Sequence, residues 1–211
     1  DMWHAVGHEI MSPLQSLMAL NGPQDPGHRY VQRMQQAIHV LYGTASPAEA
    51  LQAADVPEGR LDLDAFLRNV ADNAHFAGIL DVVYAPGSSN AGPVIVRADE
   101  FALEDVVTHI LRNADRYRPT GSPIRLTLTA SESTASATLH NQGSTIAEDL
   151  LERIFELGVS DPESPTPLGE GEHRGQGLFV AKTYMAKMGG TINARNTADG
   201  VAFVLTFQRL G

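Results

Sequence analysis

The stretch HILRNADRYRP, residues 109–119, places a group of polar side chains at the end of an apolar helical pattern. The apolar stripe recurs at helical spacing and consists of Leu103, Val107, Ile110 and Ala114. We expect a helix over about 99–117, whose other side carries His109, Asn113, Arg116 and Tyr117. A carboxamide, a guanidinium and a phenol suit a metal ion, a phosphate and an aromatic ring, respectively. The alternative for this stretch is an ordinary solvated helix face.

Two glycine-marked segments follow this helix. LHNQGSTI, residues 139–146, ends a strand in a turn that contains Gly143, with Asn141 available as a hydrogen-bonding group. RGQGLFVAK, residues 174–182, is a Gly-x-Gly that enters a helix, where free backbone N–H groups can receive a phosphate. The form GxGxxG and a preceding strand are both absent, so a Rossmann dinucleotide site is a poor interpretation. GxxxxGKS/T is also absent, which excludes a Walker-type phosphate loop.

The segment AVGHEIMSPLQSL, residues 5–17, predicts an amphipathic helix near the start of the chain. His8 and Ser12 lie four residues apart, opposite the apolar seam, so their side chains can meet. A neutral, exposed imidazole is a competent nucleophile, and the adjacent Glu9 could orient it and accept its proton. Two alternatives stay open for this segment: an inert surface pair, and a metal site at His4 and His8 that lacks further evident ligands.

Two regions with different periodicities divide the chain. Residues 1–56 predict two helices with apolar seams, joined by the helix-breaking NGPQDPG at 21–27. The seam residues are Trp3, Val6, Ile10, Pro13, Leu17 and Leu20 in the first helix and Val31, Met34, Ile38 and Leu41 in the second. Such an antiparallel hairpin cannot bury its seam alone, so we expect a homodimer that forms a four-helix bundle.

Residues 60–211 predict a mixed α and β domain, with one sheet and helices on one of its faces. The expected strands are LDVVYA, PVIVRA, IRLTLTA, SATLHN, GTINARN and VAFVLTF. The expected helices cover 63–78, about 99–117 and about 176–188. The Pro- and Gly-rich segment 158–175 is a loop of the length usually reserved for function.

Composition narrows the class of partner. The formal net charge of −10 argues against nucleic-acid binding and against direct contact with an anionic membrane. Cysteine is absent, which excludes disulfides and thiolate chemistry and fits a reducing compartment. No apolar run approaches the ~20 residues that span a bilayer. We therefore expect a cytoplasmic chain, whose parent protein could still be membrane-anchored.

Taken together and in this order, the motifs resemble the transmitter core of bacterial sensor histidine kinases. HEIMSPL resembles their H-box, LRNADRY their N-box, NQGSTI their G1 box, LLERIFE their F-box and RGQGL their G2 box. The resemblance covers essentially the whole chain, and five boxes in the order and spacing of the family are highly specific. It implies an α+β protein: an antiparallel helical hairpin for dimerisation and histidine phosphotransfer, 1–56, then an ATP-binding α/β sandwich of the Bergerat (GHKL) type, 60–211.

The resemblance also implies a role for each matching residue. His8 would accept the γ-phosphoryl group of ATP, with Glu9 as its proton acceptor and Ser12 supporting dephosphorylation of a partner regulator. The implied nucleotide site comprises Asn113 on Mg²⁺, Arg116 on phosphate, Tyr117 against adenine, Asn141 and Gly143 in the base pocket, and Gly175, Gly177 and Leu178 of the G2 box at the phosphates. Phe155 would anchor one end of a lid over 158–174.

Four positions depart from the pattern of the family. Asn141 replaces the aspartate that accepts a hydrogen bond from the adenine amino group; an amide oxygen can accept too, but more weakly, so an aspartate there is expected to bind adenine more tightly. Thr145 replaces the second G1 glycine, and His109 replaces an asparagine upstream in the N-box. Met11 replaces the basic residue that commonly follows the H-box histidine.

The leading functional hypothesis is an autokinase that phosphorylates His8 from Mg-ATP and passes the phosphoryl group to an aspartate of a response-regulator receiver domain. The second is a histidine phosphotransferase or regulator phosphatase with a degenerate catalytic domain that no longer binds ATP. Another Bergerat-type ATPase, such as a gyrase or chaperone relative, would lack the H-box hairpin. A purely structural dimer would leave the N- and G-boxes unexplained.

Overall fold

The structure is a computed structural model and forms two compact units, Asp1–Asp55 and Val56–Gly211. It describes residues 10, 13–14, 16–17, 19–20, 22, 25, 27–28, 30–31, 34, 56–87, 92–157, 159 and 177–211. No helix in these ranges is both long and apolar enough to cross a membrane.

In the first unit, the described residues between 10 and 20 and between 27 and 34 are helical. A turn separates them, in which the N–H of Asp25 donates to the carbonyl oxygen of Gly22 (2.8 Å). This turn lies within NGPQDPG, where the sequence predicted a break. Of the predicted seam residues that the structure describes, Ile10, Pro13, Leu17, Leu20 and Met34 are exposed and Val31 is buried; Leu14, which was not assigned to the seam, is buried as well.

The second unit is built on a five-stranded sheet in the order β2-β4-β5-β7-β6. β2 runs parallel to β4, and the other neighbours are antiparallel. The strands are β2 (Val82–Pro86), β4 (Ile124–Ala130), β5 (Thr134–Gln142), β6 (Thr191–Asn196) and β7 (Gly200–Gln208). Each was predicted from its alternation of apolar and polar residues.

A second, two-stranded sheet corrects the expectation of a single sheet. β1 (Arg60–Asp62) pairs antiparallel with β3 (Ile95–Arg97). β1 escaped the sequence analysis because three residues are too few to display a period of two. β3 was expected as a strand, but the sequence did not indicate that β1 would be its partner.

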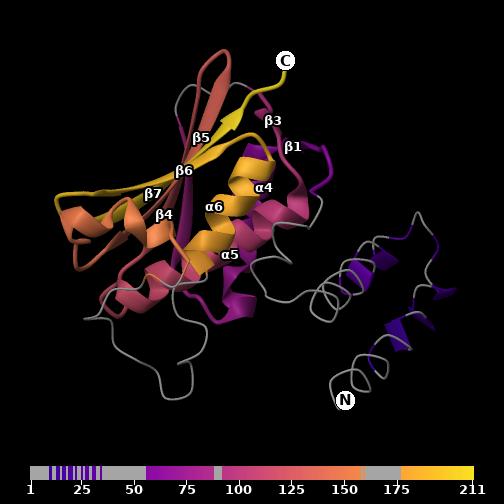
Figure 1. The fold of residues 1–211 in the computed structure, drawn as a ribbon, viewed down its shortest axis with the longest axis horizontal. Coiled ribbons are helices and arrows are strands. Elements are labelled where there is room, and N and C mark those ends of the chain that lie inside the picture. The colour runs from indigo at the N-terminus through magenta and orange to yellow at the C-terminus, as the bar shows by residue number, and fades with distance from the viewer. Residues whose placement is uncertain are drawn as a thin grey trace. The chain divides into compact units, whose positions relative to one another are not determined.

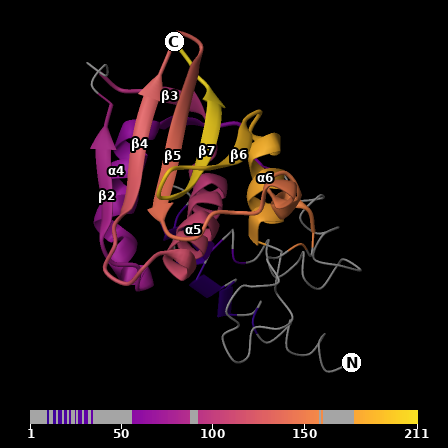
Figure 2. The same cartoon turned by 90° about the vertical axis from the view of Figure 1, so that its left-hand side faces the viewer.

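Three helices cover one face of the five-stranded sheet (Figures 1 and 2). They are α4 (Leu63–Asn73), α5 (Glu100–Tyr117) and α6 (Gly177–Lys187), with 3-10 turns at Ala74–Ala77, Glu148–Leu150 and Arg153–Phe155. α4 and α5 begin at the aspartates Asp62 and Asp99, whose side chains accept from free backbone N–H groups of the first turn. The predicted helix over 63–78 becomes 3-10 after residue 73.

The core lies between the sheet and these helices. Alternate residues of β5 point into it, and the row Ala135, Ala137 and Leu139 ends in Asn141. Among the described residues, Asn141 and Ser122 are the buried polar side chains. An amide therefore sits in a layer that is otherwise apolar, at the end of β5 that leads into the glycine-marked turn.

Candidate functional site

The C-terminal end of α5 carries the predicted N-box residues and is fixed by Arg118. The guanidinium of Arg118 donates to the Asp115 carboxylate (2.6 Å) and to the carbonyl oxygens of Ser122 (2.6 Å) and Leu80 (2.8 Å). The Arg118 side chain is 7% exposed, whereas its partner Asp115 is 40% exposed, so the guanidinium is the buried side of this ion pair. They tie the last turn of α5 to the segment that precedes β2.

That last turn presents its predicted site residues unequally. Asn113 and Tyr117 are half-buried, whereas Arg116 is exposed. The buried stripe of the helix comprises Ala102, Leu103, Val106, Val107, Ile110, Leu111 and Ala114, so the helix keeps its apolar side against the sheet. The polar side therefore faces away from the sheet.

Asn141 is buried, with 2% of its surface exposed, and only the nitrogen of its side-chain amide has a hydrogen-bond partner among the described residues. Its Nδ2 donates to the carbonyl oxygen of Gln142 (2.9 Å), which sets the orientation of the amide. No residue in the described part of the chain donates to Asn141 Oδ1. A buried acceptor without a donor costs about 1–3 kcal/mol. The arrangement therefore suits a bound molecule that supplies an N–H or O–H group at this point.

Gly143 allows the turn after β5 to touch the end of α5. Its φ is +131°, in the left-handed region, and a Cβ there would lie 2.3 Å from the carbonyl oxygen of Tyr117. Only glycine permits this approach. The structure thus brings together the two ends that the sequence assigned to one site, that of α5 with Tyr117 and that of β5 with Asn141.

Asp199, which the sequence analysis missed, holds this turn from the β6–β7 connection. Its carbonyl oxygen accepts from the N–H of Gly143 (3.0 Å), and its carboxylate accepts from Gln142 Nε2 (3.3 Å) and contacts His140 Nε2 (3.0 Å). The hydrogen bonds from Gln142 and then Thr197 lower the pKa of the Asp199 carboxyl. The sequence signals only a turn at this position, because Gly143, Gln142 and His140 lie more than fifty residues away along the chain.

Asn196, also missed, anchors the next part of the loop. Its carboxamide accepts from the N–H of Ile146 (2.9 Å) and donates to the carbonyl oxygen of the same residue (2.7 Å). One side chain thereby pairs with both backbone groups of Ile146, as a neighbouring strand would. No local pattern in the sequence marks this role.

His109 packs against the start of α6. It lies one turn before Asn113 on α5, and its Nδ1 is 3.0 Å from the place that a Cβ on Gly177 would occupy. Burial lowers the pKa of His109, the nearby Asp105 carboxylate opposes this shift, and Arg112 reinforces it. The imidazole is therefore held toward its neutral form. Leu178, the next residue of α6, is half-buried against the core.

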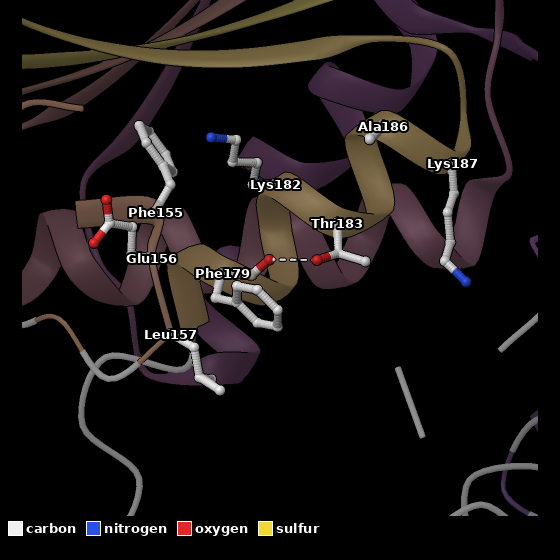
Figure 3. Close-up of a pocket in the computed structure, with 8 residues that line it drawn as sticks. All are labelled: Phe155, Glu156, Leu157, Phe179, Lys182, Thr183, Ala186 and Lys187. Atoms are coloured by element: carbon white, nitrogen blue, oxygen red, sulfur yellow. Dashed lines mark hydrogen bonds between the residues drawn. The ribbon is translucent and has the colours of Figure 1, made fainter. Parts of the chain in front are cut away.

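A separate groove of about 660 Å³ lies along α6 (Figure 3). It is lined by Phe155, Glu156, Leu157, Phe179, Lys182, Thr183, Ala186 and Lys187. Phe155, the F-box residue, is buried, packs edge-on against Phe203 and lies beneath the Lys182 ammonium. No predicted nucleotide-binding residue lines this groove, so it is distinct from the Asn141 region.

Several predicted site residues lie outside the described residues: His8, Glu9, Ser12 and Gly175. The predicted lid over 158–174 also lies outside them, apart from Val159. Their roles stay predictions. No group of three or more His, Asp or Glu side chains that could hold a metal ion occurs in the described ranges.

The residues of the candidate site lie within a stretch that matches a known protein family. A family model described as "Histidine kinase-, DNA gyrase B-, and HSP90-like ATPase" matches residues 98–210, more than half of the chain. The chain belongs to this ATPase family. The matched range contains α5, the end of β5 and the start of α6, and therefore every described residue of the predicted nucleotide site.

Relatives with curated names are sensor histidine kinases. The chain is 24% identical to the sensor histidine kinase YcbM of Bacillus subtilis, over 97% of this chain and 70% of YcbM. It is 31% identical to the sensor histidine kinase CusS of Escherichia coli K12, over 53% of this chain. The chain spans only 23% of the length of CusS.

Solved structures show the same fold. The mycobacterial sensor histidine kinase MprB matches 72% of this chain and 98% of its own, with a TM-score of 0.57 at 20% identity. Full-length ShkA, crystallised with AMPPNP, matches all of this chain and 46% of its own, with a TM-score of 0.61 at 19% identity. The predicted GHKL sandwich is confirmed.

The resemblance to histidine kinase transmitter cores is also confirmed. The ATPase match and the kinase relatives together support a histidine kinase function in two-component signalling. They do not favour the alternative of a phosphotransferase whose catalytic domain has lost ATP binding.

Proposed function

We propose that this chain is the core of a sensor histidine kinase that phosphorylates His8 from Mg-ATP and passes the phosphoryl group to an aspartate of a response regulator. The observation that carries the proposal is the buried Oδ1 of Asn141, which lies within the range of the ATPase match and accepts from no described residue. An adenine amino group supplies the missing donor, so the replacement of aspartate by asparagine leaves the pocket competent.

The residues around Asn141 fit the base of an adenine nucleotide. Asn141 Oδ1 would accept from the amino group, and Tyr117 would lie against the ring. Gly143 has no side chain to obstruct the space between them. The hydrogen bonds of Asp199 and Asn196 to the same turn would hold the pocket in shape before the nucleotide arrives.

The phosphates would extend toward the start of α6. Arg116 would contact a phosphate from the last turn of α5, and the backbone N–H groups near Gly175, Gly177 and Leu178 would face the chain of phosphates. Asn113 would hold the divalent ion through its side-chain oxygen. Mg²⁺, when bound, neutralises charge on the phosphates during transfer.

Transfer would begin with an unprotonated His8. A ring nitrogen attacks the γ-phosphorus, the bond to the β–γ bridging oxygen breaks, and ADP leaves with that electron pair. Glu9 would take the proton from the other ring nitrogen. In the second step, a carboxylate of the regulator attacks the same phosphorus and His8 leaves; Ser12 would support the later dephosphorylation of the regulator.

We also propose how the chain assembles and where in the cell it lies. Residues 1–56 would form the homodimer and present His8, and residues 60–211 would bind ATP. Because ATP and receiver domains are available in the cytoplasm, we assign the core to that side of any membrane that the parent protein contacts.

The test is a phosphorylation assay on the full chain with γ-labelled ATP, in Mg²⁺ and separately in Mn²⁺. We expect a label that is stable in alkali and labile in acid, as phosphohistidine is, and that is lost in His8→Ala. Asn113→Ala should lose the label as well, while His75→Ala, at an exposed position remote from the predicted boxes, should keep it.

Nucleotide binding, measured by calorimetry with AMPPNP, separates the two candidate functions. If the chain binds AMPPNP but γ-labelled ATP leaves no label on it, the chain binds the nucleotide without transferring its phosphoryl group. A folded dimer that neither binds AMPPNP nor becomes labelled would overturn the proposal in favour of a phosphotransferase or phosphatase.

A further inference from the structure

Three residues beside Asn141 are held by a single residue of the β6–β7 connection, Asp199. The carbonyl oxygen of Asp199 accepts from the N–H of Gly143 (3.0 Å). Its carboxylate accepts from Gln142 Nε2 (3.3 Å) and lies 3.0 Å from His140 Nε2. Asp199 therefore binds the chain on both sides of Asn141.

The contacts of Asp199 with the side chains of β5 lie on the face of the sheet opposite to Asn141. Successive side chains of a strand point to opposite faces, so His140 and Gln142 share the face that Asn141 does not. Asn141 is buried in the core, whereas Gln142 and Asp199 are exposed and His140 is half-buried. Asp199 thus reaches the end of β5 from the solvent side, and a bound base would meet Asn141 from the side of the helices.

Gly200 allows the β6–β7 connection to come this close to β5. It pairs with Gln142, and a Cβ on Gly200 would lie 2.0 Å from the carbonyl oxygen of Asn141. The connection is closed by a hydrogen bond from the N–H of Thr197 to the carbonyl oxygen of Gly200 (2.9 Å). The Thr197 hydroxyl also donates to the Asp199 carboxylate (3.1 Å). The position of this carboxylate is therefore set by the turn itself.

An asparagine in a base pocket has to be held in one orientation, whereas an aspartate does not. Both oxygens of a carboxylate are acceptors, but a carboxamide has one end that accepts and one that donates. Here the carbonyl oxygen of Gln142 takes the donating end, Asn141 Nδ2, at 2.9 Å. Without that carbonyl oxygen in place, the amide would be free to turn over and present its NH₂ group to the base.

We propose that Asp199 is a positioning residue: by binding His140 and Gln142 it keeps the Gln142 carbonyl oxygen in place, and thereby keeps Asn141 with its oxygen toward the base. This inference rests on the proposed function. The oriented oxygen favours a purine with an amino group at position 6, as in adenine, over one with an oxygen there, as in hypoxanthine. A residue on the outer face of the sheet thus controls the selectivity of a pocket on the other face.

Calorimetry with ADP and with IDP, whose base is hypoxanthine, tests this on the full chain in Mg²⁺. We expect wild type to bind ADP at least about tenfold more tightly, because IDP places an oxygen against Asn141 Oδ1. In Asp199→Asn, the ratio of the IDP Kd to the ADP Kd should fall at least about threefold, as for a partly lost hydrogen bond. The matched control is Asp72→Asn, which makes the same change of charge at an exposed position of α4 and should leave the ratio unchanged.

The ratio separates positioning from a merely structural role, which would weaken ADP and IDP equally. An unchanged ratio in a folded Asp199→Asn would therefore overturn the proposal. If circular dichroism finds Asp199→Asn unfolded, Gln142→Ala takes its place with the same expected fall, and an unchanged ratio there overturns the proposal as well. Equal Kd values for ADP and IDP in wild type would overturn it too, while the proposed function stands. If wild type binds neither nucleotide, the proposed function itself has failed.

Discussion

The structure changes the interpretation of Asn141 more than that of any other residue of the candidate site. By sequence, it is a weaker acceptor where an aspartate is usual. In the structure, its Nδ2 is committed to the carbonyl oxygen of Gln142 at 2.9 Å. A carboxylate oxygen in that place would face another oxygen, and the resulting repulsion would offset the stronger bond to adenine.

We therefore expect Asn141→Asp to destabilise the nucleotide-free domain by about 1–3 kcal/mol, because a buried hydrogen bond becomes an oxygen–oxygen contact. Urea unfolding of the full chain without nucleotide, followed by circular dichroism, measures this free energy. An unchanged midpoint at pH 7 would mean that the bond to Gln142 contributes nothing.

Asn141→Leu separates binding from stability. Leucine has a similar size and suits the apolar layer, but it offers no acceptor, so AMPPNP affinity should fall at least about tenfold, as for a lost, buried hydrogen bond. Calorimetry measures the affinity and circular dichroism checks the fold. Full affinity in a folded Asn141→Leu would remove Asn141 from the base pocket.

At the scale of elements, α4 is tied to the edge strand β2 by one carboxylate. Asp64 Oδ1 accepts from the Tyr84 hydroxyl (2.7 Å), and Asp64 Oδ2 accepts from Arg68 (3.1 Å), whose guanidinium lies over the Tyr84 ring. The bond from Tyr84 is the main cause of the lowered pKa of Asp64, and burial with the same bond raises the pKa of Tyr84. This contact holds the first helix to an edge that has a neighbour on one side only.

Tyr84→Phe should lower the stability of the domain by about 1 kcal/mol at pH 7, or about 2–4 °C in Tm. Because the folded pKa of Asp64 is depressed, its contribution is present above the unfolded value of about 3.9 and is lost as the pH falls through the folded value. Thermal unfolding from pH 7 to pH 3 checks this: the difference between wild type and Tyr84→Phe should shrink at the acid end. A difference that is constant over this range would contradict the role of the Asp64 carboxylate.

At the scale of the whole molecule, the first unit leaves apolar side chains in water. Leu20 is 82% exposed, and Ile10, Leu17, Tyr30 and Met34 are exposed as well. Exposed apolar residues at helical spacing are typical of a surface that another chain covers. They support the proposal that residues 1–56 form a homodimer.

Leu20→Glu should shift the full chain toward the monomer, because the charge would have to be buried in the bundle. Its neighbour Ala19 is exposed but small, so Ala19→Glu serves as the matched control and should leave the dimer intact. Light scattering after size exclusion measures the mass of each. An equal dimer fraction in wild type and both variants would place the interface elsewhere.

The sequence by itself determined the periodic elements and predicted which residues belong to one site. The main strands, the three helices of the second unit and the residues Asn113, Tyr117, Asn141 and Gly177 follow from patterns only a few residues long, since alternation and helical spacing are local properties. The family resemblance rests on the same short motifs.

Only the tertiary structure decided what those residues touch. The bond of Arg118 to Leu80, the hold of Asp199 on Gly143 and the packing of His109 on Gly177 join residues 38 to 68 positions apart. Such contacts depend on how the elements pack, and no local pattern encodes them. The same packing buries the amide of Asn141 and leaves its oxygen without a donor among the described residues, which supports the proposal that a ligand binds there.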